Sequence, residues 1–241
     1  MDELKLLAPL ETFDPRAFSG DSKCHQDTCD FILSLAVAYN DLKNVAMALR
    51  FLAEVRPRDL SRPTVEIGQH AGVLLHIMRL EAGIIRELLI LIEKNKAILN
   101  TPYFTELKRK LSRNAREAWG AVLSIAFERS TKHPLGKLLL FVRNKVAFHY
   151  DPKEVARGYA LVFLQSNSDR IPFISRGNSM PETRFYFADA AVEKYLLSAS
   201  DETTVRDFVS GGSPLFNDVN LALYEIITKF VNDRGFGWRL A

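Results

Sequence analysis

Apolar side chains recur every three or four residues through the first two thirds of the chain, the spacing that places them on one face of an α-helix. The pattern predicts a long helix over residues 22 to 55 and a second one that follows Pro63 and ends near Leu99. Pro57 and Pro63 bracket the short linker between them. Two long helices joined in this way are expected to pack as antiparallel neighbours.

Short polar side chains followed by proline mark the start of further helices. Thr101 and Pro102 predict a third helix, whose apolar stripe continues to about Arg129. A shorter fourth helix begins at residues 133 and 134 and stops around residues 149 and 150, because the Asp-Pro-Lys-Glu sequence at 151 to 154 is typical of a new cap and first turn.

Beyond Gly158 the pattern changes to short aromatic or β-branched runs separated by Asn, Ser, Gly and Pro. These runs are Tyr159 to Phe163, Ile171 to Ile174 and Arg184 to Phe187. They predict a small β-hairpin or ribbon.

The tail returns to helix, with amphipathic segments at Ala188 to Ser198 and Asn217 to Asp233. The expected fold class is therefore mainly α, a bundle of long antiparallel helices with a small β-hairpin or ribbon and C-terminal helices. Within it we expect a helical bundle over residues 1–165 and a C-terminal extension over residues 166–241, packed on the same body.

Composition agrees with an ordinary globular chain of 241 residues, 47% hydrophobic and 25% charged. The most apolar region, Ile84 to Ile98, contains five charged residues, so no membrane span is expected. The N-terminal sequence MDELKLLAPLE carries acids where a secretory signal carries basic residues. These features predict a cytoplasmic protein.

Two cysteines, Cys24 and Cys29, are expected to be free thiols, since a cytoplasmic chain of this size does not depend on one disulfide. With His25 they offer three metal ligands, one fewer than a structural zinc site uses. We therefore expect no metal. The sequence also lacks the glycine-rich, nucleophile-elbow and zinc-binding signatures of common enzymes, and no cofactor is predicted.

Positive charge is concentrated in one part of the chain. Residues 101–150 contain ten Lys and Arg against three Asp and Glu, whereas the formal net charge of the whole protein is +3. Arg109, Arg113 and Arg116 recur at spacings that would line one face of the third helix. This face is either a solvated surface or a contact for a polyanion such as RNA.

The segment from Phe141 to Asp151 combines an Arg-Asn pair with a histidine at the end of an apolar helix. It resembles the motif of the HEPN (higher eukaryotes and prokaryotes nucleotide-binding) family, in which Arg, a polar residue and a later His lie in a bundle of long helices. Arg143, Asn144 and His149 match that motif.

The resemblance implies a metal-independent ribonuclease of a toxin, defence or RNA-processing system that acts as a homodimer and can have an antitoxin or other partner protein. Arg143, Asn144 and His149 would be catalytic, and Lys145 would join the arginine face in contacting RNA. In a variant of the family a tyrosine beyond the histidine is modified by a partner enzyme. Here Tyr150 directly follows His149 and is the accessory candidate.

The residue types suit this chemistry, because metal-free RNA cleavage needs a base, an acid and a cation for the developing phosphorane charge. On a helix His149 lies about 120° around the axis from Arg143, which favours a site composed of two subunits. The competing hypothesis is a non-catalytic helical adaptor or a nucleotide- or RNA-binding module. A third class, a small-molecule enzyme that uses a groove between the long helices, has no residue signature.

Overall fold

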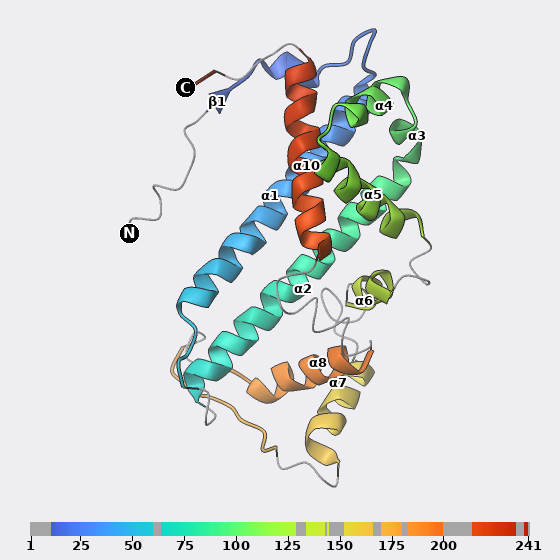
Figure 1. The fold of residues 1–241 in the computed structure, drawn as a ribbon. Helices are drawn as coiled ribbons and strands as arrows, with labels where there is room; N and C mark the ends of the chain where they lie inside the picture. Colours follow the sequence, from blue (N-terminus) through green and yellow to red (C-terminus); the bar gives the residue numbers. More distant parts are fainter. Residues whose placement is uncertain are drawn as a thin grey trace.

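Two long helices form the centre of the fold: α1 (Gln26–Glu54) and α2 (Val65–Lys94). They lie side by side and run in opposite directions (Figure 1). This confirms the mainly α fold class. The computed structural model describes residues 11–59, 64–128, 134–142, 144, 152–165, 170–179, 183–199, 214–234 and 239–240.

Shorter helices surround this pair. They are α3 (Lys96–Leu99), α4 (Pro102–Arg109), α5 (Arg113–Phe127), α6 (Pro134–Val142), α7 (Pro152–Tyr159), α8 (Tyr186–Ala199) and α10 (Pro214–Asp233), with a 3₁₀ turn at Pro15–Phe18 and a π-helical segment at Ala160–Leu164. Helix α10 lies against α1 and α5, and α6 rests on α2. Helices α7 and α8 pack on each other at the opposite end of the molecule from α4 (Figure 1).

Local capping explains where the long helices begin. The Nδ1 atom of His25 accepts a hydrogen bond from the backbone N–H of Asp27 at 3.3 Å. The hydroxyl of Thr64 accepts one from the backbone N–H of Ile67 at 3.2 Å. Each cap satisfies an N–H group that the first turn of a helix leaves without a partner.

One hydrophobic core joins α1, α2, α4, α5, α6 and α10. Its largest fully buried side chains include Phe104 from α4, Trp119 from α5 and Phe230 from α10. The C-terminal helix therefore contributes to the same core as the first 165 residues. Within the segment predicted as an extension, α10 is part of this core and α8 packs on α7.

The third predicted helix is in fact two, α4 and α5, so the prediction of one helix to about residue 129 is wrong. Thr101 caps α4 as expected. The chain then turns at residues 110–112, and Ser112 becomes the N-cap of α5 by accepting a hydrogen bond from the N–H of Ala115 at 3.2 Å. The N–H and hydroxyl of Ser112 both donate to the carboxylate of Glu225 in α10, at 2.8 and 2.5 Å. This long-range contact stabilises the break.

Replacing Ser112 with alanine is expected to lower the free energy of unfolding by about 1–2 kcal/mol, since it removes an N-cap and one of two hydrogen bonds to Glu225. Urea denaturation of the variant measures the loss. Thr105→Ala, at an exposed position on α4, is the matched control. Equal stability of the Ser112 variant and the wild type would contradict the role given to this cap.

The predicted β-ribbon is reduced to a single antiparallel bridge between Ser175 and Arg184 in the described part of the chain. Its first run is wrong as a strand, because α7 includes Tyr159 and continues into the π-helical segment. The ring of Tyr159 packs on Phe163 and Phe187, with centroids 4.9 and 6.1 Å apart. Aromatic residues that favour strands are thus used between helices, where tertiary packing overrides local preference.

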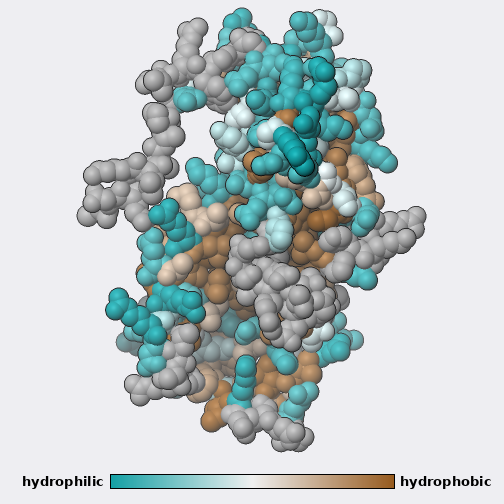
Figure 2. Space-filling model, in the orientation of Figure 1, coloured by the Kyte–Doolittle hydropathy of each residue, from teal (hydrophilic) through white to brown (hydrophobic). Residues whose placement is uncertain are grey.

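A short sheet that the pattern did not predict joins two segments far apart in the chain. Strand β1 (Glu11–Thr12) pairs antiparallel with β2 (Arg239–Leu240). Among the described residues, none of the helices combines the length and apolar character that a membrane crossing requires. On the face shown in Figure 2, apolar surface lies among hydrophilic side chains in the region where α1 and α2 run side by side.

Candidate functional site

The predicted catalytic motif begins where the buried seam of α6 ends. Leu138, Leu139 and Val142 of α6 are buried, and Asn144, two residues further on, is exposed. The other motif residues, Arg143 and His149, lie outside the described residues, as do Lys145, Tyr150 and the predicted end of the fourth helix at residues 149 and 150. Val142, directly before the motif, is thus part of the bundle core.

The three arginines predicted to contact RNA do not share one helix. Arg109 is the last residue of α4, whereas Arg113 and Arg116 lie in the first turns of α5. The predicted continuous face is therefore wrong, because the chain turns between Arg109 and Arg113. The turn nevertheless keeps them close, since Arg116 donates a hydrogen bond to the carbonyl oxygen of Arg109 at 3.3 Å.

Two of these arginines are held by neighbouring carboxylates. Arg109 donates two hydrogen bonds to Glu106, at 2.9 and 3.0 Å, and these hold the pKa of Glu106 below its usual value. Arg113 donates to Glu117 at 2.9 Å. Three arginines and two glutamates leave a local net charge of only +1, so this surface attracts a polyanion less strongly than the spacing of the arginines predicts.

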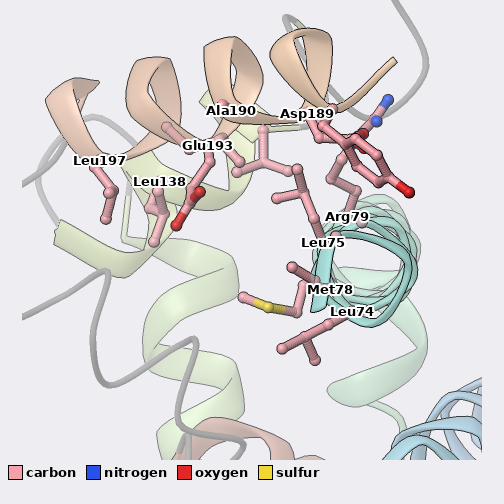
Figure 3. Close-up of a pocket in the computed structure, with 15 residues that line it drawn as sticks. Leu74, Leu75, Met78, Arg79, Leu138, Asp189, Ala190, Glu193 and Leu197 are labelled. Atoms are coloured by element: carbon pink, nitrogen blue, oxygen red, sulfur yellow. The ribbon is translucent and has the colours of Figure 1, made fainter. Parts of the chain in front are cut away.

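A cavity of about 290 Å³ lies between α2, α6 and α8. Leu75 and Met78 of α2, Leu138 of α6 and Leu197 of α8 form much of its apolar wall (Figure 3). Val142 also lines it, one residue before the motif. Residue spacing within single helices contains no sign of this cavity, because its walls come from three helices that lie far apart in the sequence.

The charged groups at the cavity are two carboxylates of α8 and a guanidinium of α2. Asp189 accepts a hydrogen bond from Arg184 at 2.8 Å, while Glu193 extends from α8 beside Leu138 and Arg79 enters from α2 (Figure 3). Phosphate sites concentrate cations and N–H donors. The cavity wall is mainly apolar and its two carboxylates are balanced by Arg79 and Arg184, so it lacks the excess of cations that is typical of a phosphate site.

Close packing of the segment after residue 183 against α2 shapes the cavity. A Cβ atom at Gly72 of α2 would lie 1.7 Å from the guanidinium of Arg184. That guanidinium also donates to Gln69 at 3.1 Å, and the hydroxyl of Tyr186 donates to the carbonyl of Val65 at 3.3 Å. The glycine therefore allows this segment to pack directly on the helix backbone.

Glu81 is a buried carboxyl that the sequence analysis did not single out. Only 2% of the residue is exposed, and burial raises its pKa to about 7. In the described part of the chain no hydrogen bond or ion pair reaches its carboxylate. The signal was present in the sequence, because Glu81 falls between Met78 and Ile85 at the spacing of the apolar stripe of α2.

Cys24 and Cys29 are both buried and free, with their sulfur atoms 3.8 Å apart. Burial, together with the neighbouring Cys29, raises the pKa of the Cys24 thiol to about 12. His25 caps α1 through Nδ1. Over the ranges that the structure covers, no group of three or more His, Cys, Asp or Glu side chains is arranged to hold a metal ion.

Comparisons with protein-family models, with curated proteins and with solved structures found no match. The resemblance to the HEPN family therefore depends on Arg143, Asn144 and His149 and on their helical setting. It stays a prediction.

Proposed function

We propose that this protein is a HEPN-like, metal-independent endoribonuclease of a toxin, defence or RNA-processing type, acting in the cytoplasm as a homodimer, with or without a partner protein such as an antitoxin. One observation carries the proposal. An Arg-Asn-x4-His motif directly follows the buried seam of a helix within a bundle of long helices, and its Asn144 is exposed.

Each motif residue has a role that its chemistry supports. His149 acts as general base towards the ribose 2′-hydroxyl or as general acid towards the leaving 5′-oxygen, since its ordinary pKa lies near neutrality. Arg143 offers a planar set of donors for the phosphorane oxygens. Asn144 donates to the substrate or holds the histidine, and Tyr150 is an accessory group.

The RNA backbone would be held by exposed cations near the motif in sequence. Arg109, Arg113, Arg116 and Lys145 are the candidates. Side chains of Arg109 and Arg113 are 76% and 84% exposed, so a phosphate can exchange with their glutamate partners without displacing core residues. Such contacts release counterions, and binding would weaken steeply as the salt concentration rises.

The second candidate is a non-catalytic helical adaptor or a nucleotide- or RNA-binding module. The glutamate pairing of Arg109 and Arg113 favours it, because a surface built to attract RNA gains nothing from neutralising its own charge. In this alternative the charged surface and the C-terminal helices bind a protein partner.

Incubation of end-labelled RNA with the purified protein in excess EDTA tests the proposal. We expect cleavage products that end in 2′,3′-cyclic phosphates, which is the product of attack by the 2′-hydroxyl. A folded protein that leaves several different RNAs intact, and whose affinity for RNA does not change with salt, would contradict the ribonuclease and favour the adaptor.

A further inference from the structure

The outer face of α1 is apolar where a surface helix is normally polar. Leu33, Val37, Met47 and Phe51 are 50%, 57%, 40% and 55% exposed. At 100° per residue they fall within about 80° of arc. Buried side chains of the same helix, such as Leu42, lie on the opposite side and contact the core. Among the described residues of a single copy, this outer face therefore has no packing role.

The spacing along this face is that of a coiled-coil seam. Successive seam positions are four, three, four, three and four residues apart, which is the alternation of a heptad repeat. The seam consists of Leu33, Val37, Asn40, Asn44, Met47 and Phe51. Its two central residues, Asn40 and Asn44, are polar and exposed, and its four outer residues are apolar. In coiled coils a polar residue at such a position selects register and oligomeric state.

We propose that this seam binds a second copy of the same chain, with the two α1 helices parallel about a two-fold axis. Each seam residue then meets its own counterpart, which makes the seam complementary to itself. In heptad notation Leu33 takes a d position, while Val37 and Asn44 take a positions. Leucine at d, a β-branched residue at a and an asparagine at another a position are typical of parallel pairs of helices.

The two asparagines can be satisfied inside such a dimer. Each amide group carries both hydrogen-bond donors and an acceptor, so Asn40 can pair with Asn40 of the second copy, and Asn44 with Asn44. A shift of register would place an asparagine against an apolar side chain and leave its amide without a partner, which is costly. The asparagines therefore fix the register at which the apolar layers meet.

Charge selects the parallel orientation over the antiparallel one. Asp41 and Lys43 are exposed and flank the seam on its two sides, at the e and g positions of the heptad. In an antiparallel dimer that still paired the apolar seam residues with each other, Lys43 would lie beside Lys43 of the second copy. Asp41 would likewise lie beside Asp41, and these like charges would repel. In the parallel dimer a g residue meets the e residue five positions further along the other helix, so Lys43 meets Ala48. Asp41 likewise meets Ala36.

The proposed surface is separate from the motif-bearing helix. Helix α1 packs on α2 and α10 through its opposite face, whereas α6 packs on α2 and α8. In Figure 1 the C-terminal part of α1 lies at the left edge of the molecule, on the other side from α6, and its N-terminal part passes behind α10. Self-association through α1 is thus a contact additional to the pairing of motif helices that a two-subunit ribonuclease site would need. The seam variants test the α1 contact alone.

Size-exclusion chromatography with light scattering, over roughly 1–100 μM, tests the surface. The wild type is expected to dimerise, and Leu33→Glu with Phe51→Glu is expected to raise the dimer dissociation constant at least about 100-fold, because each change is present twice in the interface. The control is Leu164→Glu, at a residue that is 70% exposed in the π-helical segment and lies off the seam. A wild type that stays monomeric, or a dimer that the two seam changes leave intact, would overturn the proposal.

Cysteine cross-linking tests the orientation. Val37→Cys and Met47→Cys are each expected to form disulfide-linked dimers alone, because parallel pairing places each residue opposite its own copy. In an antiparallel dimer the two copies of residue 37 would lie about 15 Å apart along the seam, at 1.5 Å per residue. Native Cys24 and Cys29 are fully buried and provide a low background.

The decisive comparison mixes Val37→Cys with a Met47→Cys chain that carries a larger tag, so that mixed and self-linked dimers differ in mass. We expect the self-linked products and almost no mixed product. Efficient linkage in the mixture, with little from either variant alone, would show an antiparallel dimer and overturn the parallel seam.

Discussion

Cleavage of RNA is expected to slow about 10²- to 10⁴-fold when His149 is replaced by alanine, because this is the range that a positioned general acid or base contributes. Arg143→Ala is expected to slow it by about 10²- to 10³-fold, through loss of the cation that stabilises the phosphorane. Initial rates on one end-labelled RNA in EDTA measure both effects. Circular dichroism of each variant establishes that the helices are intact.

The matched control for the histidine is His76→Ala, since His76 is exposed on α2 and lies outside the motif. The His76→Ala variant is expected to cleave RNA at the wild-type rate. If the wild type cleaves RNA and His149→Ala cleaves it equally fast with the same product ends, the activity does not use this motif, and the roles given to Arg143, Asn144 and His149 are wrong.

Neutralising Glu81 is expected to stabilise the protein by about 3 kcal/mol at pH 8 and to change little at pH 4. Burial raises the pKa of Glu81 to about 7 from an ordinary value of 4.5. Below pH 4.5 the carboxyl is protonated in both states and costs nothing. Between pH 4.5 and 7 the unfolded chain releases the proton first, so the free energy of unfolding falls as pH rises, at about 1.4 kcal/mol per unit.

Urea denaturation of Glu81→Gln beside the wild type, from pH 4 to pH 8, measures this difference. The stability gap should open as pH rises through the window between 4.5 and 7 and then stay constant. Glu93→Gln is the control, because Glu93 is an exposed carboxyl on the same helix. A gap that is equally large at pH 4 and pH 8 would mean that packing of the amide, and not the charge of Glu81, causes it.

Helices were predictable wherever the signals are local. The apolar stripe of α1 and the Thr101-Pro102 cap of α4 are set by residues within one or two turns, so they are visible in the sequence. Pro134 and Pro152 likewise mark the first residues of α6 and α7. Proline at a helix start needs no partner elsewhere, since its fixed φ angle and missing N–H suit the first turn alone.

Positions that depend on distant residues were not predictable. The break between α4 and α5 is stabilised by Ser112 binding Glu225, which is 113 residues away. This break places Arg109 on a different helix from Arg113 and Arg116, although the spacing of the three arginines predicted one common face. The cavity likewise has walls from three helices that chain folding brings together.

The sequence by itself determined the helical class, the approximate helix boundaries and the motif of Arg143, Asn144 and His149, because periodicity, caps and residue spacing are local properties of the chain. Only the tertiary structure decided where the predicted third helix breaks, through the contact of Ser112 with Glu225, and that the outer face of α1 is left uncovered by the described residues of one copy. The physical reason is that burial and long-range hydrogen bonds depend on which surfaces meet, and helical periodicity shows that a face is apolar without showing what covers it.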